Sequence, residues 1–148
     1  MTRVIILLAS LSLICGIISK DKIMKTVINT KNAPAPIGPY SQAVIVNGML
    51  YVSGQVAINP ATGDVIKGSI NDETKQVMEN LKSILTEAGL DFSNVVKTTI
   101  FLKDMNNFKN VNEVYGSYFT KDFPARETVE VARLPKDVNV EISVIAAK

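Results

Sequence analysis

Hydrophobic and polar residues alternate along the C-terminal part of the chain. Every second position from 138 to 144 holds a valine or an isoleucine, and the positions between them are polar. This period of two predicts a half-buried β-strand. Residues 126–131 alternate in the same way, and Leu134–Asp137 has the composition of a turn. We therefore predict a hairpin that pairs Glu130 with Glu141 and brings Glu141 to the same face as Arg126.

Arg126 occupies the entry of this predicted hairpin. Pro124 and Ala125 precede it and restrict the direction of the chain there. A guanidinium held close to a carboxylate at the start of a strand is typical of a site for a small anion. The alternative is an ordinary surface salt bridge between the same groups.

Apolar residues recur every three or four positions in two other stretches. Asp72–Ala88 carries one apolar stripe, which predicts an amphipathic helix with Asn71 as its N-cap and Gly89 at its end. Asn106–Phe119 carries a second stripe, mostly of aromatic residues, and predicts a second helix.

Further segments alternate as strands do, and a strong turn signal, Asn47-Gly48, separates two of them. These predicted strands are Lys25–Asn29, Ala43–Val46, Met49–Ser53 and Val95–Leu102. The predicted order is three strands, a helix, a strand, a helix and two strands. A sheet with both helices packed on one face is the economical way to bury these apolar surfaces. The open face is then expected to meet solvent or another subunit.

The composition narrows the chemistry that this fold can carry. The chain has 148 residues, enough for one domain with a hydrophobic core. It contains no histidine, and its one cysteine is Cys15. The usual zinc sites, cysteine–histidine pairs and disulfides are therefore excluded, and catalysis would depend on carboxylate, arginine, tyrosine, hydroxyl or backbone groups. The residues before Met24 account for the whole net charge of +2, and a neutral remainder argues against a dedicated nucleic-acid binder.

Residues 1–23 differ in character from the rest of the chain. Val4–Ile18 is apolar apart from two serines and follows Arg3, which matches a secretory signal. The alternative interpretation is a misassigned start, with Met24 as the true first residue. We expect residues 1–23 to be an apolar leader and residues 24–148 a single domain. The protein would be cytoplasmic if Met24 is the start and exported if the leader is genuine.

Short blocks spread over residues 25–146 occur together in one order. They are Ile37–Ala43, Val52–Gln55, Lys97–Leu102, Val111–Tyr115 and Pro124–Ile142. In combination they resemble the YjgF family, also called the RidA proteins or reactive intermediate deaminases. The resemblance covers essentially the whole predicted domain.

The resemblance implies a fold, an assembly and an activity. The fold would be a chorismate-mutase-like α+β fold, with one mixed sheet of about six strands and two helices on one face. The assembly would be a homotrimer with active sites between subunits. The activity would be hydrolysis of enamine and imine intermediates, such as 2-aminoacrylate, to 2-oxoacids and ammonia. Substrates would be small 2-imino or 2-amino acids, and no metal, organic cofactor, nucleic acid or membrane partner is implied.

The family pattern also implies functional residues. Arg126 would anchor the substrate carboxylate, and Thr128 stands where many relatives have cysteine. We expect the catalytic residues to be Arg126, Glu141 and Tyr40. We expect the substrate-binding residues to be Arg126, Ser53, Gly54 and Asn112.

These residue types suit the implied reaction. Arg126 can hold a carboxylate through two parallel hydrogen bonds. Glu141 could deprotonate a water and then protonate the departing amine, and a proton shared with Glu130 would raise its pKa. A rigid Gly-Pro pair aims the Tyr40 hydroxyl, and backbone N–H groups at Gly54 could meet a carboxylate. Plain structural roles remain open: a solvated Glu141, a Tyr40 packed on the core rim, and a bulge or close packing at Gly54.

Two other functions fit the same sequence. The first is a ribonuclease or translation inhibitor, which would have to cleave RNA without histidine and without an evident phosphate-binding track. The second is a non-catalytic protein that binds small carboxylates at Arg126. Only turnover separates this binder from the enzyme.

Overall fold

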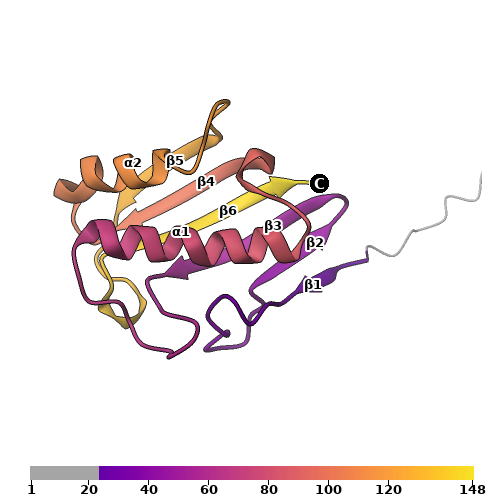
Figure 1. Ribbon diagram of the computed structural model, residues 1–148, viewed down its shortest axis with the longest axis horizontal. Coiled ribbons are helices and arrows are strands. Elements are labelled where there is room, and N and C mark those ends of the chain that lie inside the picture. Colours follow the sequence, from indigo (N-terminus) through magenta and orange to yellow (C-terminus); the bar gives the residue numbers. More distant parts are fainter. Residues whose placement is uncertain (1–23) are drawn as a thin grey trace, which may run out of the picture.

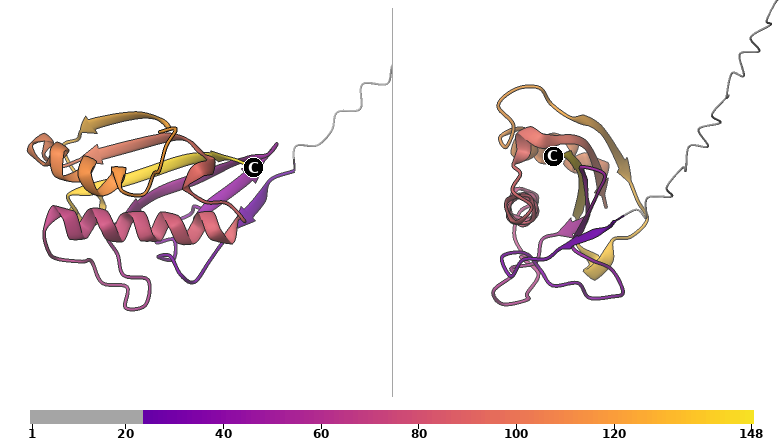
Figure 2. Two further views of the ribbon diagram at one scale, coloured as in Figure 1. Left: turned by 45° about the horizontal axis from the view of Figure 1, so that its top comes forward. Right: turned by 90° about the vertical axis from the view of Figure 1, so that its right-hand side faces the viewer.

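The computed structural model describes residues 24–148, and the predictions about the leader lie outside the described residues. The elements follow one another as three strands, a helix, a strand, a helix and two strands, with short 3₁₀ turns between them. This is the order predicted from the sequence. Both helices lie on the same side of one sheet (Figures 1 and 2).

Six strands form the sheet in the order β1-β2-β3-β6-β4-β5. They are β1 Thr26–Ile28, β2 Ala43–Val46, β3 Met49–Val56, β4 Val95–Leu102, β5 Ala125–Glu130 and β6 Val140–Ala147. Neighbouring strands are antiparallel except β4 and β5, which are parallel. The sheet is therefore mixed, with β6 near its middle and the polar strand β5 at its edge.

The first helix, α1, spans Ile70–Glu87 and begins earlier than predicted. The Ser69 hydroxyl accepts a hydrogen bond from the Asp72 backbone N–H at 3.2 Å, and the Asp72 carboxylate accepts one from the Ser69 N–H at 3.0 Å. This reciprocal capping box shows that the prediction of Asn71 as the N-cap was wrong. Gly89, with φ of +73°, follows the helix end as predicted.

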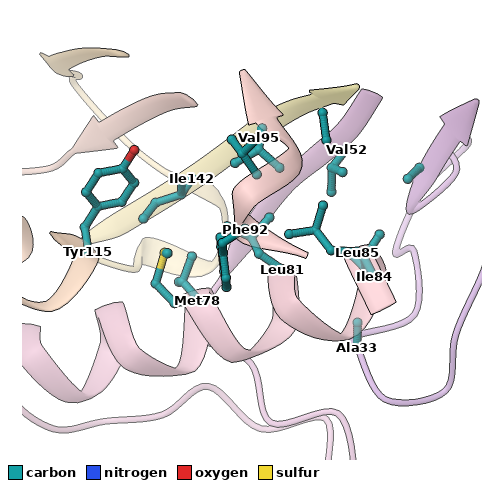
Figure 3. Packing of buried hydrophobic residues seen from close by; sticks show 14 of the residues in the cluster. Ala33, Val52, Met78, Leu81, Ile84, Leu85, Phe92, Val95, Tyr115 and Ile142 are labelled. Atoms are coloured by element: carbon teal, nitrogen blue, oxygen red, sulfur yellow. The ribbon is translucent and has the colours of Figure 1, made fainter. Parts of the chain in front are cut away.

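The second helix, α2, spans Phe108–Gly116 and follows a 3₁₀ turn at Met105–Asn107. The hydrophobic core lies between the helices and the sheet (Figure 3). From α1 it receives the fully buried Val77, Leu81, Ile84 and Leu85. An aromatic group closes the end near α2, where the Phe92 ring lies edge-on 5.3 Å from the Tyr118 ring centroid. The helices are thus fixed to the sheet by apolar packing.

The predicted C-terminal hairpin does not form. β5 pairs with β4 in parallel, and β4 lies between β5 and β6. Glu130 is therefore aligned with Leu102, and Glu141 with Phe101. The predicted pairing of Glu130 with Glu141 was wrong.

Two physical reasons explain this difference. The α2 crossover joins two parallel strands, and such connections bring the second strand alongside the first. The strand β6 is hydrogen-bonded to β3 on one edge and to β4 on the other, so it lies inside the sheet, and its alternate residues are buried on one face along its whole length. The segment between β5 and β6 holds a 3₁₀ turn at Pro135–Asp137, but it crosses over β4 instead of forming a hairpin.

The other face of the sheet carries no helix (Figure 2, right). Tyr51 and Val129 are exposed there, at 43% and 41%. An ion pair between Lys97 and Glu127 crosses from β4 to β5. None of the helices in residues 24–148 combines the length and the apolar character that a membrane span requires.

The capping box gives a direct test of where α1 begins. We expect Ser69→Ala to lower the free energy of unfolding by about 1 kcal/mol, because the Asp72 N–H loses its partner. Asn71→Ala is the matched control and should change it little, since Asn71 is exposed and caps nothing. Urea unfolding of both variants checks this, and a larger loss in Asn71→Ala would contradict the assignment.

Candidate functional site

Four of the predicted site residues line one cleft. It encloses about 290 Å³ between the Ile37–Tyr40 loop, the Ser53–Val56 end of β3, and Pro135 with Glu141. We call it the Glu141 cleft. The structure thus brings together the predicted residues Tyr40, Ser53, Gly54 and Glu141.

Glu141 lies against a β-bulge. The register of β3 on β6 shifts between Val52 and Gln55, which leaves Ser53 and Gly54 in the bulge. A Cβ atom at Gly54 would lie 1.9 Å from Glu141 Oε1, so the carboxylate occupies the space that any other side chain would fill. The strand was predicted to end at Ser53-Gly54, but β3 continues to Val56, so the predicted end was wrong. A bulge and close packing, the alternative interpretation of this glycine, are both present.

The carboxylate of Glu141 has no hydrogen-bond or ionic partner within residues 24–148. Burial of this group raises the pKa of Glu141 above its ordinary value. The direction agrees with the sequence prediction, but the cause differs, because desolvation acts here and no second carboxylate lies opposite. Such a group can exchange a proton closer to neutral pH.

The loop beside Glu141 is fixed by its own hydrogen bonds. The Tyr40 hydroxyl accepts from the Ile37 N–H at 3.2 Å, which leaves the hydroxyl proton free to be donated. Ser53 Oγ donates to the Ser41 carbonyl at 2.7 Å and holds this loop on β3. Both side chains therefore shape the cleft before any ligand enters.

Sequence reasoning assigned no role to Gln42 or Pro135. Gln42 is 2% exposed, and its amide nitrogen lies 2.9 Å from the Pro34 carbonyl and 3.0 Å from the Thr30 carbonyl. This buried amide fixes the wall of the cleft formed by Pro34 and Ala35. A glutamine just before the apolar strand Ala43–Val46 was the available signal.

Arg126 and Asn112 line a second cleft of about 400 Å³, formed with Tyr115, Gly116, Phe123 and Pro124. We call it the Arg126 cleft. The guanidinium carbon of Arg126 lies 5.1 Å from the Tyr115 ring centroid and 5.8 Å from that of Phe108. These rings orient the side chain through cation–π contacts. Arg126 forms no ion pair within residues 24–148, so its N–H donors can receive a carboxylate.

Tyr115 connects Arg126 to the core. Its hydroxyl donates to Thr98 Oγ1 at 3.1 Å, in the buried layer beneath the guanidinium. Burial raises the pKa of Tyr115, and the Thr98 hydrogen bond and the Arg126 charge oppose this only in part. The phenol therefore stays protonated and keeps its bond to Thr98. Sequence reasoning placed Tyr115 on an apolar stripe and missed this support.

The prediction that Arg126 and Glu141 share a face was wrong. Arg126 is aligned with the buried Thr98, on the helix side of the sheet. Glu141 is aligned with Phe101, an odd number of residues further along β4, and so faces the open side. Glu130 accepts a hydrogen bond from the Met105 N–H at 2.8 Å and takes no part in either cleft. The cause is again the position of β4 between β5 and β6.

The described residues thus offer a free guanidinium on aromatic rings and, separately, a free, half-buried carboxylate. No group of three or more acidic or cysteine side chains suited to a metal ion occurs within residues 24–148. Fold and site together define an α+β protein with two separate clefts, one containing a guanidinium without an ion-pair partner and the other a half-buried carboxylate without one, among residues 24–148.

The comparisons with known proteins identify the family. Residues 30–148 match the family described as Endoribonuclease L-PSP. The chain belongs to this family, which is the YjgF/RidA family, and it has the chorismate-mutase-like α+β fold that its sequence blocks imply.

Several relatives match over nearly their whole length. The human 2-iminobutanoate/2-iminopropanoate deaminase is 48% identical over 126 residues, which cover 85% of this chain and 92% of that protein. A Rid family protein from Yersinia pestis, described as of unknown function, superimposes with a TM-score of 0.83 at 52% identity, covering 84% of this chain and all of the other. The structure of E. coli TdcF with bound serine has a TM-score of 0.80 at 41% identity, covering 83% and 98%.

The burial of Glu141 predicts a pH-dependent effect on stability. Its pKa is higher in the folded than in the unfolded protein, so its stabilising contribution is present at low pH and is lost as pH rises through the folded pKa. Glu141→Gln removes this loss. We expect the variant to gain stability relative to wild type as the pH rises above about 4, the ordinary pKa of a glutamate, and we test this from about pH 4 to pH 7. Urea unfolding across this range measures the difference, and a difference independent of pH would contradict it.

Proposed function

We propose that this protein hydrolyses small 2-imino acids and their enamine tautomers, such as 2-aminoacrylate, to 2-oxoacids and ammonia. The observation that carries the proposal is the pair of uncompensated groups, a guanidinium on aromatic rings and a half-buried carboxylate. The name of the human relative, a 2-iminobutanoate/2-iminopropanoate deaminase, supports it, and so does the serine bound to E. coli TdcF.

The reaction needs modest chemical power, because an iminium carbon is already electrophilic. Arg126 holds the substrate carboxylate and fixes the position of that carbon. Glu141 accepts a proton from water as the oxygen attacks, which forms a tetrahedral carbinolamine. It then returns the proton to the nitrogen and takes the hydroxyl proton as the C=O bond forms and the C–N bond breaks, and this last proton passes to the departing ammonia, so a 2-oxoacid and ammonium remain. The raised pKa of Glu141 suits both transfers. Water is the only reactant that the substrate needs.

Tyr40, Ser53, Gly54 and Asn112 have supporting roles in this proposal. The Tyr40 hydroxyl proton can bond the substrate or the attacking water. The Ser53–Gly54 bulge supplies backbone groups and the space for the Glu141 carboxylate. Asn112 offers an amide beside Arg126.

We propose further that the active site forms between subunits of a homotrimer. Arg126 and Glu141 lie on opposite faces of one sheet, so one chain cannot bring them to the same substrate. A partner that presents its Glu141 cleft to the Arg126 cleft of its neighbour solves this problem. The exposed apolar side chains of the open sheet face, Tyr51 and Val129, suit such an interface.

The alternatives are a non-catalytic binder of small carboxylates and the endoribonuclease activity that the family description names. Binding would use the same Arg126. A Glu141→Gln variant that binds 2-oxobutanoate but has lost turnover supports the enzyme, whereas equal turnover would remove Glu141 from the mechanism. RNA degradation by protein free of contaminating nuclease would favour the endoribonuclease.

Turnover tests the proposal directly. We expect the protein to accelerate ammonia and pyruvate release from 2-aminoacrylate generated in situ. Arg126→Ala should lower kcat/KM on the order of a hundredfold, because the substrate carboxylate loses its anchor. Arg126→Lys should be intermediate, since it keeps the charge and loses the planar fork. No acceleration by a folded wild-type protein would reject the deaminase.

Mixing two inactive variants tests the shared site. Arg126→Ala and Glu141→Gln subunits, unfolded and refolded together in equal amounts, would combine an intact Arg126 with an intact Glu141 at about a quarter of the interfaces. We expect activity to return to about that fraction of wild type. Each variant refolded alone is the control. No recovery from mixed oligomers would show that both groups act within one chain.

A further inference from the structure

Helix α1 buries three polar side chains among its apolar residues. Thr74 donates to the Ile70 carbonyl of the same helix at 2.7 Å, whereas Glu73 and Asn80 bond to other parts of the chain. Glu73 is 4% exposed and Asn80 is 1% exposed, although polar groups of this kind normally face water. They are seven residues apart and so lie on the same helix face. Burial of such groups is costly unless they are hydrogen-bonded, so their partners show what they do.

Asn80 binds the chain where β3 ends. Its Nδ2 donates to the Val56 carbonyl at 3.1 Å and to the Ile58 carbonyl at 3.0 Å. Gln76 Nε2 donates to Asn80 Oδ1 at 2.9 Å and fixes the orientation of this amide. The helix therefore holds the segment that follows Gly54.

Glu73 binds the chain where β6 begins. One carboxylate oxygen accepts from the Asn139 backbone N–H at 3.0 Å, and the other accepts from Asn139 Nδ2 at 2.6 Å. On the opposite side, the Lys103 N–H donates to the Asn139 carbonyl at 3.0 Å. Asn139 is thus held from two directions, two residues before Glu141.

These bonds act where β3 gives β6 little support. Only two pairs of the β3–β6 ladder lie beyond the bulge, Gln55 with Ile142 and Val56 with Glu141. β4 pairs with β6 from Val140 onward, so the entry of β6 is well held on one edge and weakly held on the other. A carboxylate clamped to Asn139 adds support at this entry, close to Glu141.

We propose that Glu73 and Asn139 form a positioning pair that holds the Glu141 carboxylate over the Gly54 bulge. The inference rests on the proposed deaminase function of Glu141. Glu73 touches neither cleft and acts only through Asn139, whose backbone N–H and side-chain amide both donate to it. Loss of the pair lets β6 shift at its entry, and the proton-transfer group moves away from the carbon that Arg126 fixes.

The effect should appear in kcat more than in KM. We expect Asn139→Ala to lower kcat about tenfold, because a small misplacement of a reacting group is enough for such a loss. The KM should stay near its wild-type value, since Arg126 lies on another strand and still binds the substrate carboxylate. Steady-state kinetics with 2-aminoacrylate measure both constants.

Asn94→Ala is the matched control. Asn94 Nδ2 donates to the Ala147 carbonyl at 3.1 Å, so it clamps the far end of the same strand. This variant removes a side-chain amide bond from the far end of β6, together with the Asp91 N–H bond to Asn94 Oδ1, and leaves the entry of β6 undisturbed. We expect its kcat to equal that of wild type. An equal loss in Asn94→Ala and Asn139→Ala, or no loss in Asn139→Ala, would overturn the proposal.

A conservative exchange separates positioning from general destabilisation. Glu73→Ala removes both acceptors and should lower kcat as Asn139→Ala does. In Glu73→Gln the amide oxygen can accept the Asn139 N–H, and a flipped Asn139 amide can accept from the new Nε2. We expect Glu73→Gln to recover most of the lost kcat. If it is as impaired as Glu73→Ala, the hydrogen bonds are not what matters and the proposal is wrong.

A spectroscopic readout keeps this inference distinct from the proposed function. The ¹³C signal of the Glu141 side-chain carboxyl reports its surroundings without any substrate. We expect its titration to change in Asn139→Ala and to be unchanged in Asn94→Ala. If wild type hydrolyses no imine, the proposed function fails, and this signal alone decides whether the pair positions Glu141. A signal unchanged in Asn139→Ala overturns the positioning pair.

Discussion

The parallel pairing of β4 with β5 determines how the charged groups of this chain are distributed. Because β4 lies between β5 and β6, the side chains of Arg126 and Glu141 emerge on opposite faces of the sheet. Two groups of opposite charge therefore cannot neutralise each other within one subunit. Each lies in a cleft of its own and has no ion-pair partner among residues 24–148.

The position of β4 between β5 and β6 also affects the pKa of Glu141. A hairpin between β5 and β6 would place Glu130 opposite Glu141, and the repulsion between the two carboxylates would raise the pKa of Glu141. Within residues 24–148 the residue of β4 aligned with Glu141 is Phe101, and the burial of the Glu141 carboxylate raises its pKa instead. The guanidinium meanwhile rests on the rings of Tyr115 and Phe108, which orient it without consuming its hydrogen-bond donors. The same strand order thus leaves both groups without a charged partner in the described part of the chain.

Local signals in the sequence predicted local structure well. The bounds of Val95–Leu102 are those predicted, Asn47-Gly48 has the positive φ angles of a tight turn, and Gly89 follows α1. Some of the residues that line the two clefts were also predictable, because every predicted site residue lines one cleft or the other. Strand order was not predictable in this way. The turn-like composition of Leu134–Asp137 indicates that the chain changes direction there. It does not indicate whether a third strand lies between the two strands that this segment connects.

The polar residues of α1 show why a stripe of apolar positions gives an incomplete description of a helix. The stripe correctly predicted which face packs on the sheet, but Glu73 and Asn80 share that face. Strands that end beneath a helix leave backbone groups that water cannot reach, and each such group needs a partner. Side chains from α1 supply those partners at the ends of β3 and β6. Helix α1 therefore fixes the chain segments that form the Glu141 cleft, although Glu73 and Asn80 are buried and do not line the cleft themselves.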